Sequence, residues 1–100
     1  MINLTDKTEI EKHYHVFFLG QVQGVGFRYT ARSCADKYAI YGWVANRSDG
    51  TVELDIEGKV SDLDNFVKEL KEEFKTYVKS VRIEELPYSG EYNNFQIRFY

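Results

Sequence analysis

Nine residues from Gly20 to Arg28, with the sequence Gly-Gln-Val-Gln-Gly-Val-Gly-Phe-Arg, follow a short apolar run and precede a helical pattern. Any fold of this chain must therefore place a glycine-rich turn between a strand and a helix. Gly24 and Gly26 can adopt backbone conformations closed to other residues, so successive N–H groups can turn inward around a negative group. A helix beginning near Phe27 adds its unpaired N–H groups and the positive end of its dipole. We predict an anion-binding loop here.

Arg28 lies in the first turn of this predicted helix. Because helical side chains lean back toward the N-terminus, its guanidinium can close over whatever the loop holds. A planar fork of N–H donors suits phosphate. Gln23 is expected to contribute either a backbone N–H group or support from its side chain. The predicted phosphate-binding loop comprises Gln23, Gly24, Val25, Gly26, Phe27 and Arg28.

Other glycine-rich phosphate motifs do not fit this segment. The nucleotide-binding pattern G-x-x-x-x-G-K-[ST] is absent, and the dinucleotide pattern G-x-G-x-x-G fails at Tyr29. The segment is thus neither a P-loop nor a dinucleotide loop. A purely structural turn is the alternative to an anion site, since glycine-rich turns between strands and helices are common.

Hydrophobic periodicity predicts the remaining elements. Strands are indicated at 14–19, 43–46, 51–57, 78–86 and 95–100, and amphipathic helices begin near Phe27 and Ser61. Gly42 is expected to mark the end of the first helix or the turn beyond it, and Ser61 to cap the second helix. This order predicts an α+β fold of the ferredoxin-like, split βαβ type. Such a fold has a mostly antiparallel sheet of four or five strands, with both helices on one face.

The predicted strand at 51–57 alternates strictly between apolar and polar residues. Its apolar face is expected to meet the helices, and the face that bears Glu53, Asp55 and Glu57 is expected to meet water. His13 and His15 have an i, i+2 spacing but no third ligand nearby in sequence, so we interpret them as ordinary strand residues. No metal and no cofactor is expected.

Composition places the chain among small globular proteins. Its 100 residues suffice for one domain, and 43% hydrophobic residues argue against disorder. We predict a mobile tail over residues 1–12, which lack an apolar face, and a single domain over residues 13–100. The net charge of −3 argues against nucleic acid or an anionic membrane as a partner. The single Cys34 is expected to pack as a small core residue rather than act as a catalytic thiol. With no membrane span or signal peptide in the sequence, we expect a cytoplasmic monomer.

Two motifs of the sequence resemble those of the acylphosphatase family. The segment from Gly20 to Arg28 matches the pattern G-x-V-Q-G-V-x-F-R at every fixed position. The segment from Gly42 to Gly58 matches the second pattern, G-[FYW]-[AV]-x-N-x-x-x-G-x-V-x5-G. The resemblance covers the chain from Tyr14 to the C-terminus, and two long motifs at a compatible separation make it specific.

This resemblance implies a sheet order of 4-1-3-2 with the terminal strand beside strand two. It also implies metal-independent hydrolysis of a small-molecule acyl phosphate to a carboxylate and inorganic phosphate. In this family pattern Arg28 binds the phosphoryl group, and Asn46 orients the attacking water. A position at the start of the hairpin is the structural alternative for Asn46, because asparagine is favoured in turns.

Three other classes of protein share parts of this pattern. An RNA-binding domain needs exposed aromatic residues on a basic sheet face, whereas Glu53, Asp55 and Glu57 would repel phosphates. A non-catalytic phosphate- or anion-binding regulatory module of the same fold would retain both motifs, and only an assay separates it from an enzyme. The third class is a domain of a larger carbamoyl-transfer protein. Because the chain starts at Met1 and closes on an aromatic strand, we expect a free-standing enzyme.

Overall fold

The computed structural model describes residues 10–99, which form an α+β fold of the ferredoxin-like, split βαβ type. Its elements follow the predicted order, and the predicted fold class is confirmed. They are β1 (Glu11–Gly20), α1 (Phe27–Tyr38), β2 (Tyr41–Asn46), β3 (Val52–Lys59), α2 (Val60–Glu73), β4 (Val78–Leu86) and β5 (Phe95–Arg98).

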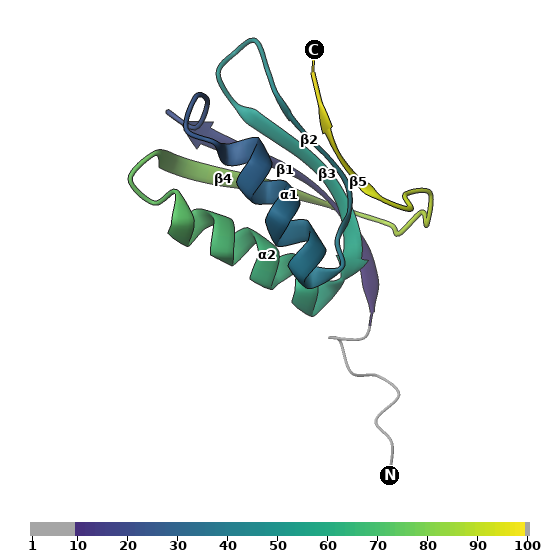
Figure 1. The fold of residues 1–100 in the computed structure, drawn as a ribbon. Coiled ribbons are helices and arrows are strands. Elements are labelled where there is room, and N and C mark those ends of the chain that lie inside the picture. The colour runs from purple at the N-terminus through teal and green to yellow at the C-terminus, as the bar shows by residue number, and fades with distance from the viewer. Residues whose placement is uncertain (1–9, 100) are drawn as a thin grey trace.

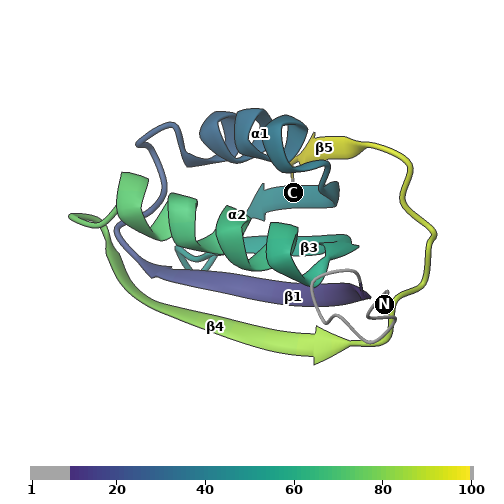
Figure 2. The same cartoon turned by 90° about the horizontal axis from the view of Figure 1, so that it is seen from below.

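The strands form one five-stranded sheet in the order β4-β1-β3-β2-β5. All neighbouring strands are antiparallel except β2 and β5, which run parallel. Both helices lie on the same face of this sheet, as Figures 1 and 2 show from two directions. The sheet order implied by the family resemblance is therefore confirmed. The turn after β1, the hairpin between β2 and β3, and the C-terminal end of β5 all lie at one end of the molecule (Figure 1).

The core lies between the helices and the face of the sheet that they cover. Successive strand side chains point to opposite faces, so alternate residues of β1 and β3 are fully covered. On α1 and α2 the buried residues recur at helical spacing, as the sequence predicted. The buried hydrophobic residues of these four elements are Tyr14, Val16, Phe18, Phe27, Ala31, Cys34, Ala35, Val52, Leu54, Ile56, Leu63, Phe66, Val67 and Leu70.

Two helix ends differ from the predictions. Helix α1 ends at Tyr38, and Ala39 rather than Gly42 takes the left-handed conformation that closes it, with φ of 54°. Gly42 is instead the second residue of β2. Helix α2 begins at Val60, so the predicted N-cap at Ser61 is wrong. The N–H group of Val60 donates to the carbonyl oxygen of Ile10 at 2.8 Å, so contact with the residue just before β1 starts this helix without a side-chain cap.

The first strand of the sheet begins three residues before the strand predicted at 14–19. Strand β1 begins at Glu11, because Glu11 lies opposite Lys59 and Lys12 lies opposite Gly58 in the β1–β3 ladder. Residues 1–9, which make up most of the predicted tail, lie outside the described residues. Within the described residues, neither helix has the length and apolar character needed to cross a membrane.

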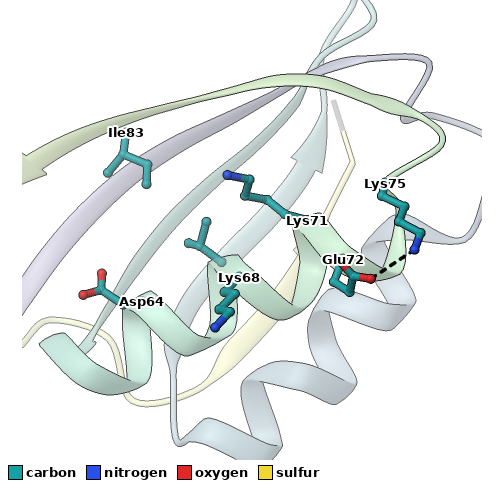
Figure 3. Close-up of a pocket in the computed structure, with 7 residues that line it drawn as sticks. Asp64, Lys68, Lys71, Glu72, Lys75 and Ile83 are labelled. Atoms are coloured by element: carbon teal, nitrogen blue, oxygen red, sulfur yellow. Dashed lines mark hydrogen bonds and ion pairs between the residues drawn. The ribbon is translucent and has the colours of Figure 1, made fainter.

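A hollow of about 460 Å³ lies between α2 and the edge strand β4 (Figure 3). Lys68 and Lys71 of α2 and Ile83 of β4 are among its lining residues, and Lys75 forms an ion pair with Glu72 at 3.2 Å. None of the residues predicted to bind phosphate lines this hollow. It therefore plays no part in the candidate site described below.

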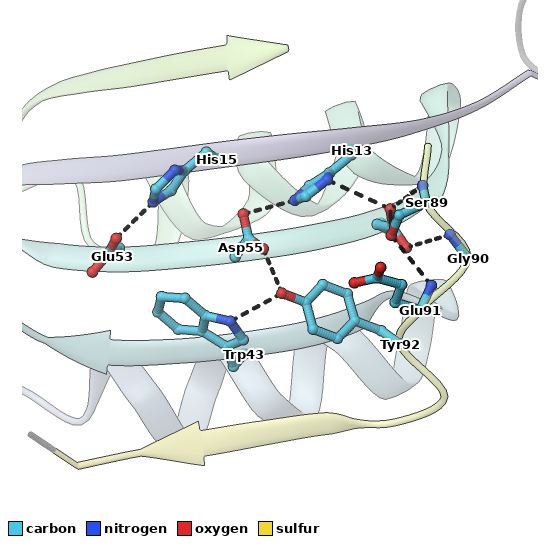
Figure 4. A network of polar contacts seen from close by, with 10 residues as sticks. His13, His15, Trp43, Glu53, Asp55, Ser89, Gly90, Glu91 and Tyr92 are labelled. Atoms are coloured by element: carbon cyan, nitrogen blue, oxygen red, sulfur yellow. Dashed lines mark hydrogen bonds and ion pairs between the residues drawn. The ribbon is translucent and has the colours of Figure 1, made fainter. Parts of the chain in front are cut away.

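The face of the sheet opposite the helices is less open than the sequence predicted (Figure 4). Glu53 and Glu57 were expected to meet water, yet they are only 5% and 2% exposed. Glu57 accepts hydrogen bonds from the backbone N–H groups of Ser89 and Gly90 and from the Ser89 hydroxyl. The segment between β4 and β5 therefore covers this carboxylate and supplies its hydrogen-bond donors.

Two histidines on this face pair with the same row of carboxylates. His13 Nε2 lies 2.7 Å from Asp55 Oδ1, and His15 Nε2 lies 2.6 Å from Glu53 Oε2. Asp55 also accepts a hydrogen bond from the Tyr92 hydroxyl (Figure 4). Each histidine thus has a side-chain partner within the sheet. In the part of the chain that the structure describes, no group of three or more metal-ligating side chains is arranged to hold an ion.

Candidate active site

The glycine-rich loop between β1 and α1 has the backbone conformation that its sequence requires. Gly24 and Gly26 have φ values of +77° and +82°, in the left-handed region that side chains disfavour. A Cβ atom added at either glycine would meet nothing within 4 Å, so conformation rather than space demands glycine there. Gly26 is the N-cap of α1, and no side chain of residues 10–99 caps the helix. The first N–H groups of α1 therefore stay free of a side-chain partner.

Buried apolar side chains hold the two ends of this loop. Val22 is fully buried, and the ring of Phe27 lies 4.8 Å from the ring of Phe18 and 4.7 Å from that of Phe74. Val25 packs against the same core. These contacts fix the path of the backbone between them, so the loop is shaped before any ligand binds. The role of Val22 was missed, although an apolar residue between two glutamines is the signal for such an anchor.

Gln23 connects the loop to the β2–β3 hairpin. Its side-chain amide donates hydrogen bonds to the carbonyl oxygens of Arg47 at 2.7 Å and Thr51 at 2.9 Å. The same two residues close the hairpin, since Arg47 N donates to Thr51 O at 2.9 Å. One glutamine thus holds the turn that follows β2 against the loop that follows β1.

This connection brings Asn46 beside the loop. Asn46 is the last residue of β2 and pairs with Val52 in the sheet. Its amide oxygen Oδ1 is buried and is the one buried side-chain nitrogen or oxygen of residues 10–99 that lacks a hydrogen-bond partner. Leaving such an acceptor unpaired costs free energy. A hydrogen-bond donor from outside the protein, such as a bound water, would remove this cost.

Arg28, Asn46 and two glycines of the loop, Gly24 and Gly26, line the same hollow, which has a volume of about 90 Å³. This volume exceeds several-fold what one water molecule needs. The guanidinium carbon of Arg28 lies 4.8 Å from the centre of the Phe99 ring, a distance typical of a cation–π contact. The residues lining the hollow are Val22, Gly24, Gly26, Phe27, Arg28, Tyr29 and Asn46.

Tyr29 and Phe99 were not assigned to the site from the sequence. Tyr29 follows Arg28 directly, and the structure puts it in the wall of the hollow. Phe99 approaches Arg28 from just beyond the end of β5. No local pattern links a residue near the C-terminus to the first turn of α1, so only the parallel pairing of β5 with β2 reveals this contact.

The charge of the hollow favours an anion. None of the described residues that line it is acidic, and Arg28 and the N-terminus of α1 both present positive charge. The nearest carboxylates in sequence are engaged elsewhere: Glu53 pairs with Arg47 at 3.2 Å, and Asp49 accepts hydrogen bonds from Thr51. These bonds from Thr51, with a smaller contribution from Arg47, hold the pKa of Asp49 below its usual value.

Comparison with known proteins identifies relatives over most of the chain. A family model described as Acylphosphatase matches residues 14–97. The chain is 37% identical to an acylphosphatase of Bacillus pumilus over 87 residues, which cover 86% of this chain and 97% of that protein. It is 40% identical to an acylphosphatase of Methanospirillum hungatei over 89 residues, covering 87% and 97% of the two chains. The crystal structure of acylphosphatase from Bacillus subtilis matches with a TM-score of 0.79 and 35% identity, covering 87% of this chain and 98% of that one.

Proposed function

This chain belongs to the acylphosphatase family of hydrolases, which cleave acyl phosphates, and we propose that Arg28 and Asn46 carry the reaction in the hollow beside the glycine-rich loop. Arg28 and the loop N–H groups bind the phosphoryl oxygens, and Asn46 orients the attacking water. The observation that carries this proposal is that Asn46, whose buried Oδ1 has no hydrogen-bond partner among residues 10–99, lines the same hollow as Arg28. An amide oxygen accepts a hydrogen bond from water, but it cannot donate one to a phosphate oxygen.

The reaction needs positioning and charge more than it needs a covalent intermediate. The water oxygen forms a bond to phosphorus while the bond from phosphorus to the acyl oxygen breaks, and the carboxylate R–COO⁻ leaves. Because a carboxylate is a good leaving group, the transition state is loose and its charge lies on the phosphoryl oxygens. The guanidinium fork of Arg28 and the preorganised loop N–H groups are the donors that stabilise this charge.

The proton of the attacking water has no basic side chain to accept it in the hollow. An asparagine amide cannot take a proton at neutral pH, and none of the described lining residues is a carboxylate or a histidine. We therefore assign the proton to a phosphoryl oxygen of the substrate, which leaves as dihydrogen phosphate. The hydrolysis is then assisted by the substrate and proceeds without a metal ion.

Steady-state hydrolysis of benzoyl phosphate in the presence of a metal chelator tests this proposal. We expect turnover to survive chelation, and we expect Asn46→Ala to lower kcat by about 100- to 1000-fold while inorganic phosphate still raises Tm. Asn65→Ala, which changes an exposed asparagine of α2, is the matched control and should retain turnover.

Two results would change the assignment. If Asn46→Ala abolished the effect of phosphate on Tm, Asn46 would be a phosphate ligand rather than the residue that orients water. If the wild-type protein bound phosphate but hydrolysed no acyl phosphate, the non-catalytic anion-binding module would replace the enzyme.

We further propose that the enzyme works as a monomer in the cytoplasm, without nucleic acid or membrane as a partner. The lone Cys34 is buried and suits a reducing compartment, and the acidic net charge disfavours polyanionic partners. Light scattering of the purified protein, with and without added RNA, tests the oligomeric state and the absence of a complex.

A further inference from the structure

A second hollow adjoins the one that contains Arg28 and Asn46. It has a volume of about 380 Å³ and lies between α1 and β5, which run side by side in Figures 1 and 2. Tyr29 lines both hollows, and Phe99, which lines the second, contacts the guanidinium of Arg28. The residues lining the second hollow are Tyr29, Arg32, Phe95, Gln96, Ile97 and Phe99. We refer to it as the α1–β5 groove.

The position of the groove relative to Arg28 determines what can enter it. A substrate whose phosphoryl group is held by the loop and Arg28 must direct its acyl group out of the small hollow. Val22 and Phe27 close the inner side of that hollow, because both are buried in the core. Tyr29 is 64% exposed and forms the wall shared with the groove. The groove is therefore an open path for the acyl group.

Arg32 gives this groove a second positive charge. It lies one turn beyond Arg28 on the same helix, so the two α-carbons are about 6 Å apart along the helix axis. Its side chain has no hydrogen bond or ion pair with any residue of the described range 10–99. None of the described residues lining the groove is acidic. The guanidinium of Arg32 is thus available to an anion that lies in the groove.

We propose that the α1–β5 groove binds the acyl group of the substrate, and that Arg32 selects acyl groups carrying a second anionic group. The preferred substrate class is then an acyl phosphate of a short dicarboxylic acid. The two charged ends of such a substrate are separated by roughly one helical turn. This length matches the separation of about 6 Å along the helix axis between the α-carbons of Arg28 and Arg32. This inference rests on the proposed function, because it assumes that the loop holds the phosphoryl group.

The apolar residues of the groove suit the carbon atoms of such a substrate. Phe95 and Ile97 are half-buried beneath it, and Phe99 is 72% exposed at its end next to Arg28. Methylene groups can cover these side chains while both ends of the substrate meet guanidinium groups. The position of Arg32 in the wall of this groove assigns it to substrate specificity.

Two substrates of equal length provide the test. Succinyl phosphate and butyryl phosphate differ in that a carboxylate replaces a terminal methyl group. We expect the wild-type enzyme to favour succinyl phosphate in kcat/KM by about fivefold, chiefly through KM, as for a partly exposed charge pair. In Arg32→Gln the ratio of the two kcat/KM values should fall to about one. In Arg32→Lys, which keeps the charge but not the fork, part of the preference should remain.

The control is Lys68→Gln, which removes an exposed positive charge from α2 and should leave the ratio of the two substrates at its wild-type value. A preference for succinyl phosphate that persists in Arg32→Gln would overturn the inference, as would a wild-type ratio near one. Turnover of butyryl phosphate by the wild-type enzyme tests the proposed function separately. If neither substrate were hydrolysed, the proposed function would fail, and this inference with it.

Discussion

The side-chain nitrogen of Gln23 lies 2.7 Å from the carbonyl oxygen of Arg47, and this hydrogen bond connects the glycine-rich loop to the strand end that carries Asn46. A second hydrogen bond from the same amide reaches Thr51. Both carbonyl groups also accept backbone hydrogen bonds within the hairpin, from Gly50 and Arg47 respectively. Gln23 is therefore not needed to satisfy these carbonyl groups, and its effect is to set the distance between loop and hairpin.

Removing this connection should lower activity more than stability. In Gln23→Met the side-chain volume is kept while both donors are lost, so we expect a loss of only about 1 kcal/mol in the free energy of unfolding. A small displacement of Asn46 relative to Arg28 should lower kcat by about tenfold or more. Urea denaturation and steady-state kinetics measure the two effects. Wild-type kcat in Gln23→Met would show that the hairpin holds its position without this side chain.

Replacing Arg28 should cost more activity than replacing Asn46. Arg28→Ala removes both phosphoryl binding and transition-state charge, so kcat/KM should fall by more than about 1000-fold, or about 4 kcal/mol. Arg28→Lys should recover only part of this loss, because a lysine lacks the planar fork. Arg82→Ala, at an arginine of β4 that lies over Phe17 on the opposite face of the sheet, serves as the control. Near-normal kcat/KM in Arg28→Ala would remove Arg28 from the site.

The buried carboxylate of Glu57 should contribute strongly to stability. Glu57→Ala leaves the N–H groups of Ser89 and Gly90 without their acceptor, so the free energy of unfolding should fall by about 2–4 kcal/mol. Glu84→Ala on the exposed part of β4 should change it by less than about 0.5 kcal/mol. Urea denaturation of both variants is the measurement. A loss below about 1 kcal/mol in Glu57→Ala would mean that water replaces the carboxylate at the Ser89 and Gly90 N–H groups.

Cys34 should be inert toward thiol reagents in the folded protein. Burial, followed by the hydrogen bond that its Sγ donates to Glu69, raises the pKa of this thiol to about 12. At pH 8 a maleimide should therefore modify the native protein far more slowly than the urea-unfolded protein, because the thiolate is the reactive form. Equal modification rates in the two states would contradict the buried position of Cys34.

The same pKa gives a pH dependence with a definite sign. Above pH 9.0, the ordinary pKa of the thiol, the unfolded chain loses a proton that the folded protein keeps up to about pH 12. The contribution of Cys34 to stability is thus complete below pH 9 and is lost as the pH rises through this window. In Cys34→Ala the free energy of unfolding should fall less steeply between pH 9 and pH 11, as measured by urea denaturation. The raised pKa values of Tyr14 and Tyr92 act in the same direction and should leave a residual slope in this variant.

The elements and the two motifs were predictable because their signals are local. Helix α1 is recognised by Phe27, Ala31 and Cys34 on one face, and β3 by the alternation of Val52, Leu54 and Ile56. The loop conformation was predictable in the same way, because Gly24 and Gly26 are residues that adopt positive φ without strain, and both have positive φ in the structure. Periodicity and backbone preference belong to neighbouring residues, and neighbours in the sequence remain neighbours in any fold.

The errors and omissions came from contacts between distant parts of the chain. Glu53 and Glu57 have the alternation of a solvent-facing row, yet His15, Arg47 and Ser89 cover them from other elements. A polar residue that another segment later covers has the same pattern as one that stays in water. The start of α2 at Val60 was missed for the same reason, because the N–H group of Val60 donates to the carbonyl oxygen of the distant Ile10.

By itself the sequence determined the order of the strands and helices along the chain, the glycine loop and the identity of Arg28 and Asn46 as candidates. Only the tertiary structure decided that Gln23 joins the loop to the hairpin, that Asn46, with its unpaired Oδ1, lines the same hollow as Arg28, and that Phe99 and Arg32 border the same groove. The physical reason is that sheet register and strand order set which distant side chains meet. Those are properties of the packed sheet as a whole rather than of any one of its strands.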